Sequence, residues 1–183
     1  MVNIREITFL TSGESYFSDI DHLDAIFVSE PPEQPDENKL YVAGLDLGRK
    51  RDYTALSILE KETGREVCLY RVNQKHWYDI LTAVVDRIAE WGVRDFWVED
   101  NNIGDIALEE LDNYIVNHPT CDATLFVYNT NYKTKPKLVN QFHSAISNKD
   151  LTLLPDNNAK SEIYQYQAPV SYTHLTLPTN REV

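Results

Sequence analysis

The spacing of the apolar residues changes near residue 75, from the two-residue period of strands to the 3.6-residue period of helices. Three strand-like segments come first, at 41–47, 54–60 and 66–72, and short turn sequences such as Thr63-Gly64 separate them. From Trp77 to Ile88 the apolar residues recur at helical spacing, and Gly92 follows as a C-terminal cap. This order predicts an antiparallel meander of three strands with an amphipathic helix packed on it.

Strands and helices alternate in the rest of the chain. The segments 96–98 and 124–128 have the apolar character of buried strands. Helices are predicted over 103–116 and from about 136 to 147, because apolar residues there recur on one face. The whole order predicts an α/β fold with a mixed sheet, in which strands 1–3 are antiparallel, the later strands are parallel, and helices flank the sheet.

Composition predicts three parts along the chain. Residues 28–39 contain three prolines and four acids, which is typical of an extended linker, so residues 1–40 are interpreted as a leader. The last residues, from about Val170, read Val-Ser-Tyr-Thr-His-Leu-Thr-Leu-Pro-Thr and look like translated sequencing-adapter sequence. We therefore expect an ordered domain over 41–169 and a non-native tail over 170–183.

Several classes of protein are disfavoured by what the sequence lacks. Hydrophobic residues make up 42% of the chain, yet no apolar stretch reaches the length of a membrane-spanning helix, and the start does not resemble a signal peptide. The two cysteines form no CxxC pair, and the five histidines show no ligand spacing. No GxSxG, HExxH or GxxxxGK[ST] motif occurs. We expect a cytoplasmic protein with reduced thiols that is not a serine hydrolase, zinc protease or P-loop ATPase.

The formal charge of -12 argues at first against a nucleic-acid partner. However, residues 1–40 hold nine acids and two bases, so much of the excess lies in the leader. In the remainder, residues 95–132 contain eight acids and no Lys or Arg, whereas residues 123–149 contain four lysines and no acid. An acidic segment beside a basic one suits a site that holds a divalent metal in one place and phosphate in another. The alternative is that these are ordinary solvated charges.

Three carboxylates are candidate metal ligands. Asp46 lies in an otherwise apolar strand, where an unpaired charge is costly, and Asp52 lies across the following loop. Glu99 ends another predicted strand, at the edge of the sheet where α/β proteins place their sites. Converging carboxylates favour hard divalent ions such as Mg²⁺ or Mn²⁺, and two such ions would support phosphodiester cleavage. The alternatives are a salt bridge from Asp46 to Arg49 or Lys50, and a helix-capping role for Glu99.

Two groups of bases are candidates for binding phosphate. One group is on the loop between Asp46 and Asp52, and the other surrounds Pro136 at the start of a predicted helix; they comprise Arg49, Lys50 and Arg51, and Lys133, Lys135 and Lys137. Lysines at a helix N-terminus are unfavourable unless an anion binds there, so the second group favours a phosphate. For both groups, solvated side chains are the alternative.

The segment Tyr41-Val-Ala-Gly-Leu-Asp-Leu-Gly-Arg-Lys-Arg-Asp-Tyr-Thr-Ala-Leu-Ser, followed by Val98-Glu-Asp-Asn-Asn-Ile-Gly, resembles the C-terminal nuclease domain of tailed-phage terminase large subunits. The resemblance covers about residues 41–169 and implies a ribonuclease H-like fold. It implies that Asp46 and Glu99 bind the catalytic metals and that Asp52 is an additional ligand. The leader around Ser12 looks like the end of an ATPase domain, and no nucleotide site is expected in this chain.

The resemblance also implies a function. It indicates a two-metal-ion endodeoxyribonuclease that cuts concatemeric viral DNA during genome packaging in the host cytoplasm. Double-stranded DNA, the terminase ATPase domain, the small terminase subunit and the portal are the implied partners. The family has a further Asp at the start of its last helix, and this chain lacks that motif, so weak or absent cleavage is expected.

Three other functions are compatible with parts of the sequence. A Holliday-junction-resolvase-like nuclease shares the fold and the chemistry. Gly44-Leu-Asp-Leu-Gly also resembles the first phosphate-binding hairpin of actin-like ATPases and sugar kinases, although the chain is too short for their second lobe. The non-enzymatic alternative is a docking module of the packaging motor whose carboxylates are structural.

Overall fold

The computed structural model describes residues 15–18, 20–28, 32, 34–48, 52–100 and 105–167. Residues 20–157 form one compact unit, and the described residues 15–18 and 158–167 belong to a second. In chain order the elements are η1 (Leu23–Ile26), β1 (Tyr41–Asp46), β2 (Thr54–Glu60), β3 (Glu66–Val72), α2 (Trp77–Glu90), β4 (Asp95–Glu99), α3 (Asp105–Asn117), β5 (Thr124–Tyr128), α4 (Thr134–Ser147) and α5 (Asn157–Gln165).

The five strands form one mixed sheet in the order β3-β2-β1-β4-β5. β1, β2 and β3 are antiparallel neighbours, whereas β4 is parallel to both β1 and β5. The predicted meander and the predicted parallel half are therefore both confirmed. β1 is the central strand, and it joins the two halves of the sheet.

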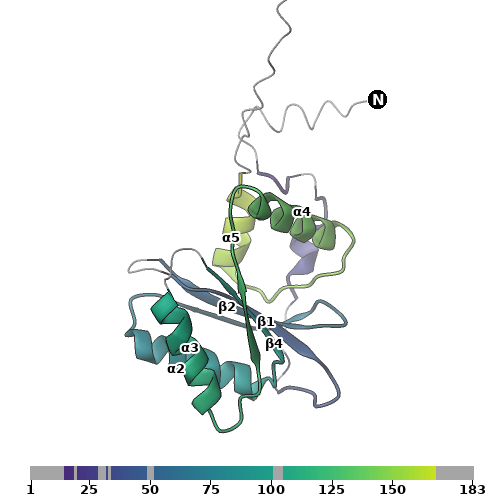
Figure 1. Cartoon of the computed structure of the whole chain (residues 1–183). Helices are drawn as coiled ribbons and strands as arrows, with labels where there is room; N and C mark the ends of the chain where they lie inside the picture. Colours follow the sequence, from purple (N-terminus) through teal and green to yellow (C-terminus); the bar gives the residue numbers. More distant parts are fainter. Residues whose placement is uncertain are drawn as a thin grey trace, which may run out of the picture. The chain divides into compact units, whose positions relative to one another are not determined.

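The main hydrophobic core lies between one face of the sheet and helices α2 and α3, which lie side by side in Figure 1. The alternation along β1 buries Tyr41, Ala43 and Leu45 on this face. The apolar stripe of α2 faces the same core and consists of Ile80, Leu81, Val84, Val85 and Ile88. Each such side chain contributes about 1.5–3 kcal/mol when fully buried, so burial of the predicted apolar stripe holds α2 against the sheet.

The start of α4 depends on a residue just before it. α4 begins at Thr134, two residues earlier than predicted, because the Asn131 side chain accepts hydrogen bonds from the backbone of Lys133 (2.9 Å) and Thr134 (3.2 Å). This Asx turn satisfies amides that a helix start leaves unpaired. The predicted start of α3 at residue 103 lies outside the described residues, and the helix is described from Asp105.

Residues 20–28, within the predicted leader, are hydrogen-bonded to the segment that follows α4. Leu153 donates its amide to the carbonyl of Ile26, and Val28 donates to the carbonyl of Leu153, each at 2.6 Å. Leu23 and Ile26 of η1 are buried.

Among the described helices, none combines the length and the apolar character that crossing a membrane requires.

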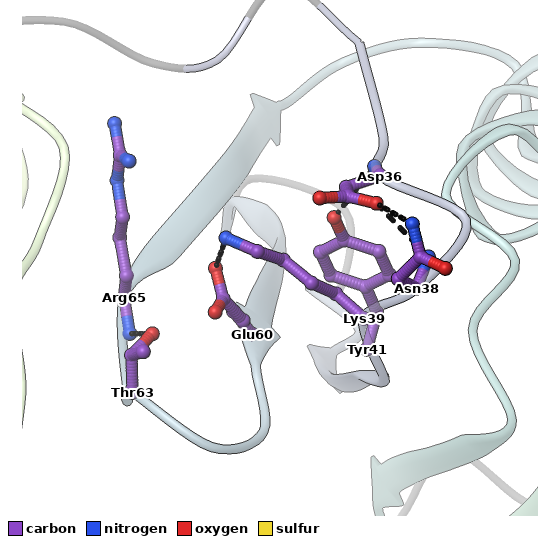
Figure 2. A network of polar contacts seen from close by, with 7 residues as sticks. All are labelled: Asp36, Asn38, Lys39, Tyr41, Glu60, Thr63 and Arg65. Atoms are coloured by element: carbon purple, nitrogen blue, oxygen red, sulfur yellow. Dashed lines mark hydrogen bonds and ion pairs between the residues drawn. The ribbon is translucent and has the colours of Figure 1, made fainter.

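A polar network fixes the start of β1, at the opposite end of the strand from Asp46 (Figure 2). Lys39 pairs with the buried carboxylate of Glu60 at 2.8 Å, and this contact raises the pKa of Lys39. The Asp36 amide donates to the Tyr41 hydroxyl at 2.9 Å, while hydrogen bonds from Asn38 lower the pKa of the Asp36 carboxyl. The network therefore anchors the chain where it enters the sheet.

Gly64 and Gly92 provide a matched pair of substitutions. Both have positive φ, 65° and 58°, but a Cβ at Gly64 would lie 2.0 Å from the Asp150 carbonyl oxygen, whereas one at Gly92 would meet nothing within 4 Å. Gly92→Ala is expected to cost about 1–2 kcal/mol of backbone strain, and Gly64→Ala distinctly more. Urea unfolding of both variants measures the difference; equal losses would mean that residue 150 does not pack against Gly64.

Glu66 is expected to make stability depend on pH. Burial raises the pKa of its carboxyl, and hydrogen bonds from Ser57 (2.6 Å) and the Leu154 amide (2.9 Å) only partly oppose this. The folded state therefore binds the proton more tightly than the unfolded chain, so stability falls as the pH rises from the unfolded pKa through the folded one. Urea unfolding between pH 4.5 and 7 should show a smaller fall for Glu66→Gln than for the wild type.

Exposed Glu62, on the turn between β2 and β3, provides the control. The variant Glu62→Gln is expected to keep the wild-type pH dependence. A Glu66→Gln variant with an unchanged pH dependence would show that the buried carboxyl does not cause it.

Candidate metal centre

The carboxylates of Asp46 and Glu99 lie at the same edge of the sheet. Asp46 is the last residue of β1 and Glu99 the last residue of β4. These strands are parallel neighbours, and the two carboxylates come one step beyond the Leu45–Val98 pair. Asp52 comes two residues before β2, at the same end of the β1–β2 hairpin. The register thus brings Asp46 and Glu99 together, and the hairpin places Asp52 at the same edge of the sheet.

Asp46 and Glu99 also share a face of the sheet. Leu45 and Val98 are buried in the core, so alternation directs their neighbours Asp46 and Glu99 to the opposite face. Gly44 is on that face too, and a Cβ there would meet nothing within 4 Å. The space over Gly44 is therefore open among the described residues.

The charges of the neighbouring carboxylates act on Asp46. Desolvation raises the pKa of Asp46, and the negative charges of Glu99 and Asp52 raise it further. Lys135, at the start of α4, partly offsets the effect. A bound cation would relieve the same repulsion, because an opposite charge favours the ionised form of a carboxyl.

Two threonines position the site, and sequence reasoning missed both. Thr130, just after β5, donates a hydrogen bond from its hydroxyl to the Glu99 carboxylate. The buried Thr54 hydroxyl accepts a hydrogen bond from the Gly48 amide at 3.1 Å. A Cβ at Gly48 would lie 2.5 Å from backbone atoms of Asp52 and Tyr53, so only glycine lets the loop close and hold Asp52 near β1. The Gly48–Thr54 hydrogen bond joins residues only six positions apart in the chain. The Thr130–Glu99 hydrogen bond joins residues 31 positions apart, so it depends on the register of β4 and β5.

No family model matches the chain. Two curated relatives match 83 of its residues, and both are terminase large subunits. The protein of Thermus virus P23-45 is 34% identical and that of Thermus phage G20c 33% identical over this segment. The segment covers 43% of this chain but spans only 16% of the length of each relative.

The solved structures match a larger part of the chain. The large terminase nuclease of thermophilic phage G20c with bound magnesium superimposes with a TM-score of 0.67 and 22% identity, over 82% of this chain and 79% of that one. The fold is that of large terminase nuclease domains. The HK97 large terminase, with a TM-score of 0.61 and 12% identity, matches 81% of this chain and 36% of its own. The predicted ribonuclease H-like α/β fold and the predicted resemblance to terminase large subunits are both confirmed.

Within this terminase nuclease fold, the donor atoms suit a hard divalent ion. Asp46, Asp52 and Glu99 offer only carboxylate oxygens, the ligands that Mg²⁺ and Mn²⁺ prefer. The described residues contain no group of three or more His, Cys, Asp or Glu side chains that is already arranged to hold a metal. The carboxylates are thus close enough to repel one another but do not form a closed ligand shell.

The lysines of α4 lie at the start of the helix, as predicted. Lys133 is the N-cap residue, Lys135 and Lys137 belong to the first turn, and all three are exposed. Lys133 also lies over the Tyr132 ring, with its Nζ 5.4 Å from the ring centroid. The positive charge of Lys135 lowers the pKa of the Asp46 carboxyl, so this lysine connects the basic group to the carboxylates. The other predicted basic residues, Arg49, Lys50 and Arg51, lie outside the described residues.

Two cavities lie near the core of the terminase nuclease fold. The larger, about 380 Å³, is between α2 and α3 and contains none of the predicted site residues. The smaller, about 190 Å³, includes Asp52 in its wall. Only the smaller cavity therefore adjoins the candidate metal centre.

Proposed function

We propose that this chain carries the metal-dependent endonuclease domain of a phage terminase large subunit and cuts concatemeric DNA during genome packaging in the host cytoplasm. The observation that carries the proposal is the position of Asp46 and Glu99 at the ends of neighbouring parallel strands in a large terminase nuclease fold. The nuclease of phage G20c binds magnesium in the solved structure, which supports a divalent ion here.

In this proposal Asp46 and Glu99 hold two Mg²⁺ or Mn²⁺ ions, and Asp52 completes the ligand set. When bound, the ions would supply an activated water and stabilise the departing oxygen in phosphodiester cleavage. Thr130 keeps the Glu99 carboxylate in place through its hydrogen bond. The Gly48–Thr54 contact does the same for the loop that carries Asp52.

The exposed lysines of α4 bind the DNA backbone in this proposal. Lys133, Lys135 and Lys137 surround a helix N-terminus, whose amides and partial positive charge favour phosphate. Arg49, Lys50 and Arg51 supply further backbone contacts from the β1–β2 loop. The ATPase domain, the small terminase subunit and the portal are the proposed protein partners.

We also propose that the nuclease domain extends over 41–169 and that residues 170–183 replace its natural end. The aspartate expected there is missing, so this chain should cleave weakly or not at all. The test is Mn²⁺-dependent nicking of plasmid by a chain whose natural reading frame continues past Pro169. Strong nicking is expected from the continued chain. A continued chain without cleavage would count against the nuclease, and vigorous cleavage by the present chain would refute the impairment.

Lys135→Gln is expected to weaken DNA binding through the loss of one phosphate contact. Binding to duplex DNA should become less dependent on salt, with the slope of log K against log salt concentration smaller by about 1. Fluorescence anisotropy at several salt concentrations measures this slope. Lys149→Gln is the control, because Lys149 is exposed just beyond the other end of α4. Equal slopes for the wild type and Lys135→Gln would remove Lys135 from the DNA-binding surface.

A further inference from the structure

A cavity of about 190 Å³ adjoins the candidate metal centre at Asp52. It lies between the β1–β2 loop and the connection from β3 to α2. The described residues that line it come from both ends of the β1–β2 loop, from the connection between β3 and α2 and from the first turn of the helix: Gly48, Asp52, Thr54, Val72, Asn73, Gln74, Lys75, Trp77 and Ile80.

The wall of this cavity combines three kinds of group. Val72, Trp77 and Ile80 provide an apolar surface that suits the face of a flat ring. Asn73 and Gln74 carry amide groups with both donors and acceptors, the groups that recognise the edges of bases. A simple anion would leave the apolar surface of the cavity unused, whereas a ligand with a ring and polar edges could contact both kinds of group. The combination therefore favours a ligand with a ring and polar edges.

Charge at the rim adds a place for a phosphate. Lys75 lines the cavity and is exposed, so it offers a cation that solvent reaches. Asp52 lines the cavity as well, and its carboxylate accepts hydrogen bonds such as those of exocyclic amines. A phosphate is consequently expected beside Lys75, away from Asp52.

The size of the cavity limits the ligand to a small unit. Its volume is about 190 Å³. Sites for drug-sized ligands usually measure about 300–1,000 Å³. One base with its sugar partly outside is the nucleic-acid unit that this volume suits.

Two residues of the cavity wall have distinctive local structure. The Trp77 indole donates a hydrogen bond to the Glu110 carboxylate of α3 at 2.5 Å, which fixes the ring. Gln74 has a φ of 54°, a backbone conformation that non-glycine residues seldom adopt and that tends to occur at binding sites. The wall of the cavity therefore includes one tethered aromatic ring and one unusual backbone conformation.

We propose that this cavity binds one nucleotide of the DNA strand, next to the phosphate that is cleaved, with the base against Trp77 and its phosphate beside Lys75. The proposal rests on the proposed nuclease function and adds a subsite to it. A nucleotide held here would fix the strand relative to Asp52, because this residue belongs to both the cavity and the candidate metal centre.

The test is an NMR titration of the chain with deoxyadenosine 5′-monophosphate (dAMP) and, separately, with inorganic phosphate. The nucleotide is expected to shift the side-chain amide signals of Asn73 and Gln74 and the indole signal of Trp77. Phosphate alone at the same concentration should leave these three signals unchanged. Equal shifts with both probes, or no shift with dAMP, would overturn the proposal.

A substitution tests the role of the amide. Gln74→Gly removes the side chain but tolerates the positive φ, so the fold should be retained, and dAMP affinity is expected to fall at least fivefold. Lys149→Gly is the matched control, because Lys149 also has positive φ, 61°, and does not line the cavity. Unchanged affinity in Gln74→Gly would overturn the proposal.

Mn²⁺ binding separates this inference from the proposed function. If the chain binds Mn²⁺ but dAMP shifts none of the cavity signals, the subsite is wrong and the nuclease proposal stands. If dAMP shifts them but Mn²⁺ does not bind, the cavity is a nucleotide site and the metal-dependent nuclease is wrong.

Discussion

Replacing Asp46 with asparagine is expected to remove most of the stabilisation that Mn²⁺ gives to the folded chain. A ligand present at 100 times its dissociation constant stabilises the folded state by about 2.7 kcal/mol, which for a chain of this size raises Tm by roughly 5–11 °C. The asparagine side chain would keep the shape of the aspartate but lose the negative charge. Thermal unfolding with and without Mn²⁺ measures the effect.

Without metal, Asp46→Asn should not lower Tm. The wild-type carboxylate is destabilised by desolvation and by the charges of Glu99 and Asp52, which raise its pKa. The neutral amide removes this repulsion, although the gain is small because the residue is exposed to solvent. The variant thus separates metal binding from folding.

Asp95→Asn is the control for the metal prediction. Asp95 is the first residue of β4, at the opposite end of the strand from Glu99, and its carboxylate pairs with Lys61 at 3.1 Å. It should retain the full Mn²⁺ shift. A wild-type shift in Asp46→Asn, or an equal loss in both variants, would show that the ion binds elsewhere or without specificity.

Phe96→Ala is expected to lower the free energy of unfolding by about 3–5 kcal/mol, the usual cost of removing a large side chain from a core. Phe96 is 0% exposed and lies on β4, between β1 and β5. A typical domain has only about 5–15 kcal/mol of stability in total, so the variant would lose a large part of it. Urea unfolding monitored by circular dichroism gives the difference.

The neighbouring residue supplies the comparison. Trp97 points to the opposite face, is 45% exposed, and stacks on Phe126 with 4.7 Å between ring centroids. Trp97→Ala should cost about 1 kcal/mol, mainly the value of the aromatic pair. If the two substitutions cost the same, the assignment of the buried face of β4 would be wrong.

Much of the fold was predictable because the periodicity of the apolar residues matches their burial. The strands over 41–47, 54–60 and 66–72 and the helix that begins at Trp77 all occur close to their predicted bounds. η1 and α5 were missed for physical reasons. η1 has only four residues, and α5 has no buried residue, so neither has an apolar stripe that a sequence pattern would reveal.

The edge of the sheet that carries the candidate site was predictable, whereas the contacts around it were not. Asp46 and Glu99 end predicted strands, and parallel neighbours place such ends together. The hydrogen bond from Thr130 to Glu99 joins residues 31 positions apart, and it requires the register of β4 and β5. The metal-binding roles of Asp46, Asp52 and Glu99 stay predictions.

The direct test of the central claim is paramagnetic broadening of the NMR signals by Mn²⁺ at substoichiometric concentration. The ion broadens signals of nearby nuclei most strongly, so the account predicts that Asp46, Asp52 and Glu99 lose intensity first while Asp95, at the opposite end of β4 from Glu99, remains sharp. Uniform broadening of the exposed acids, or selective broadening around α3, would contradict it.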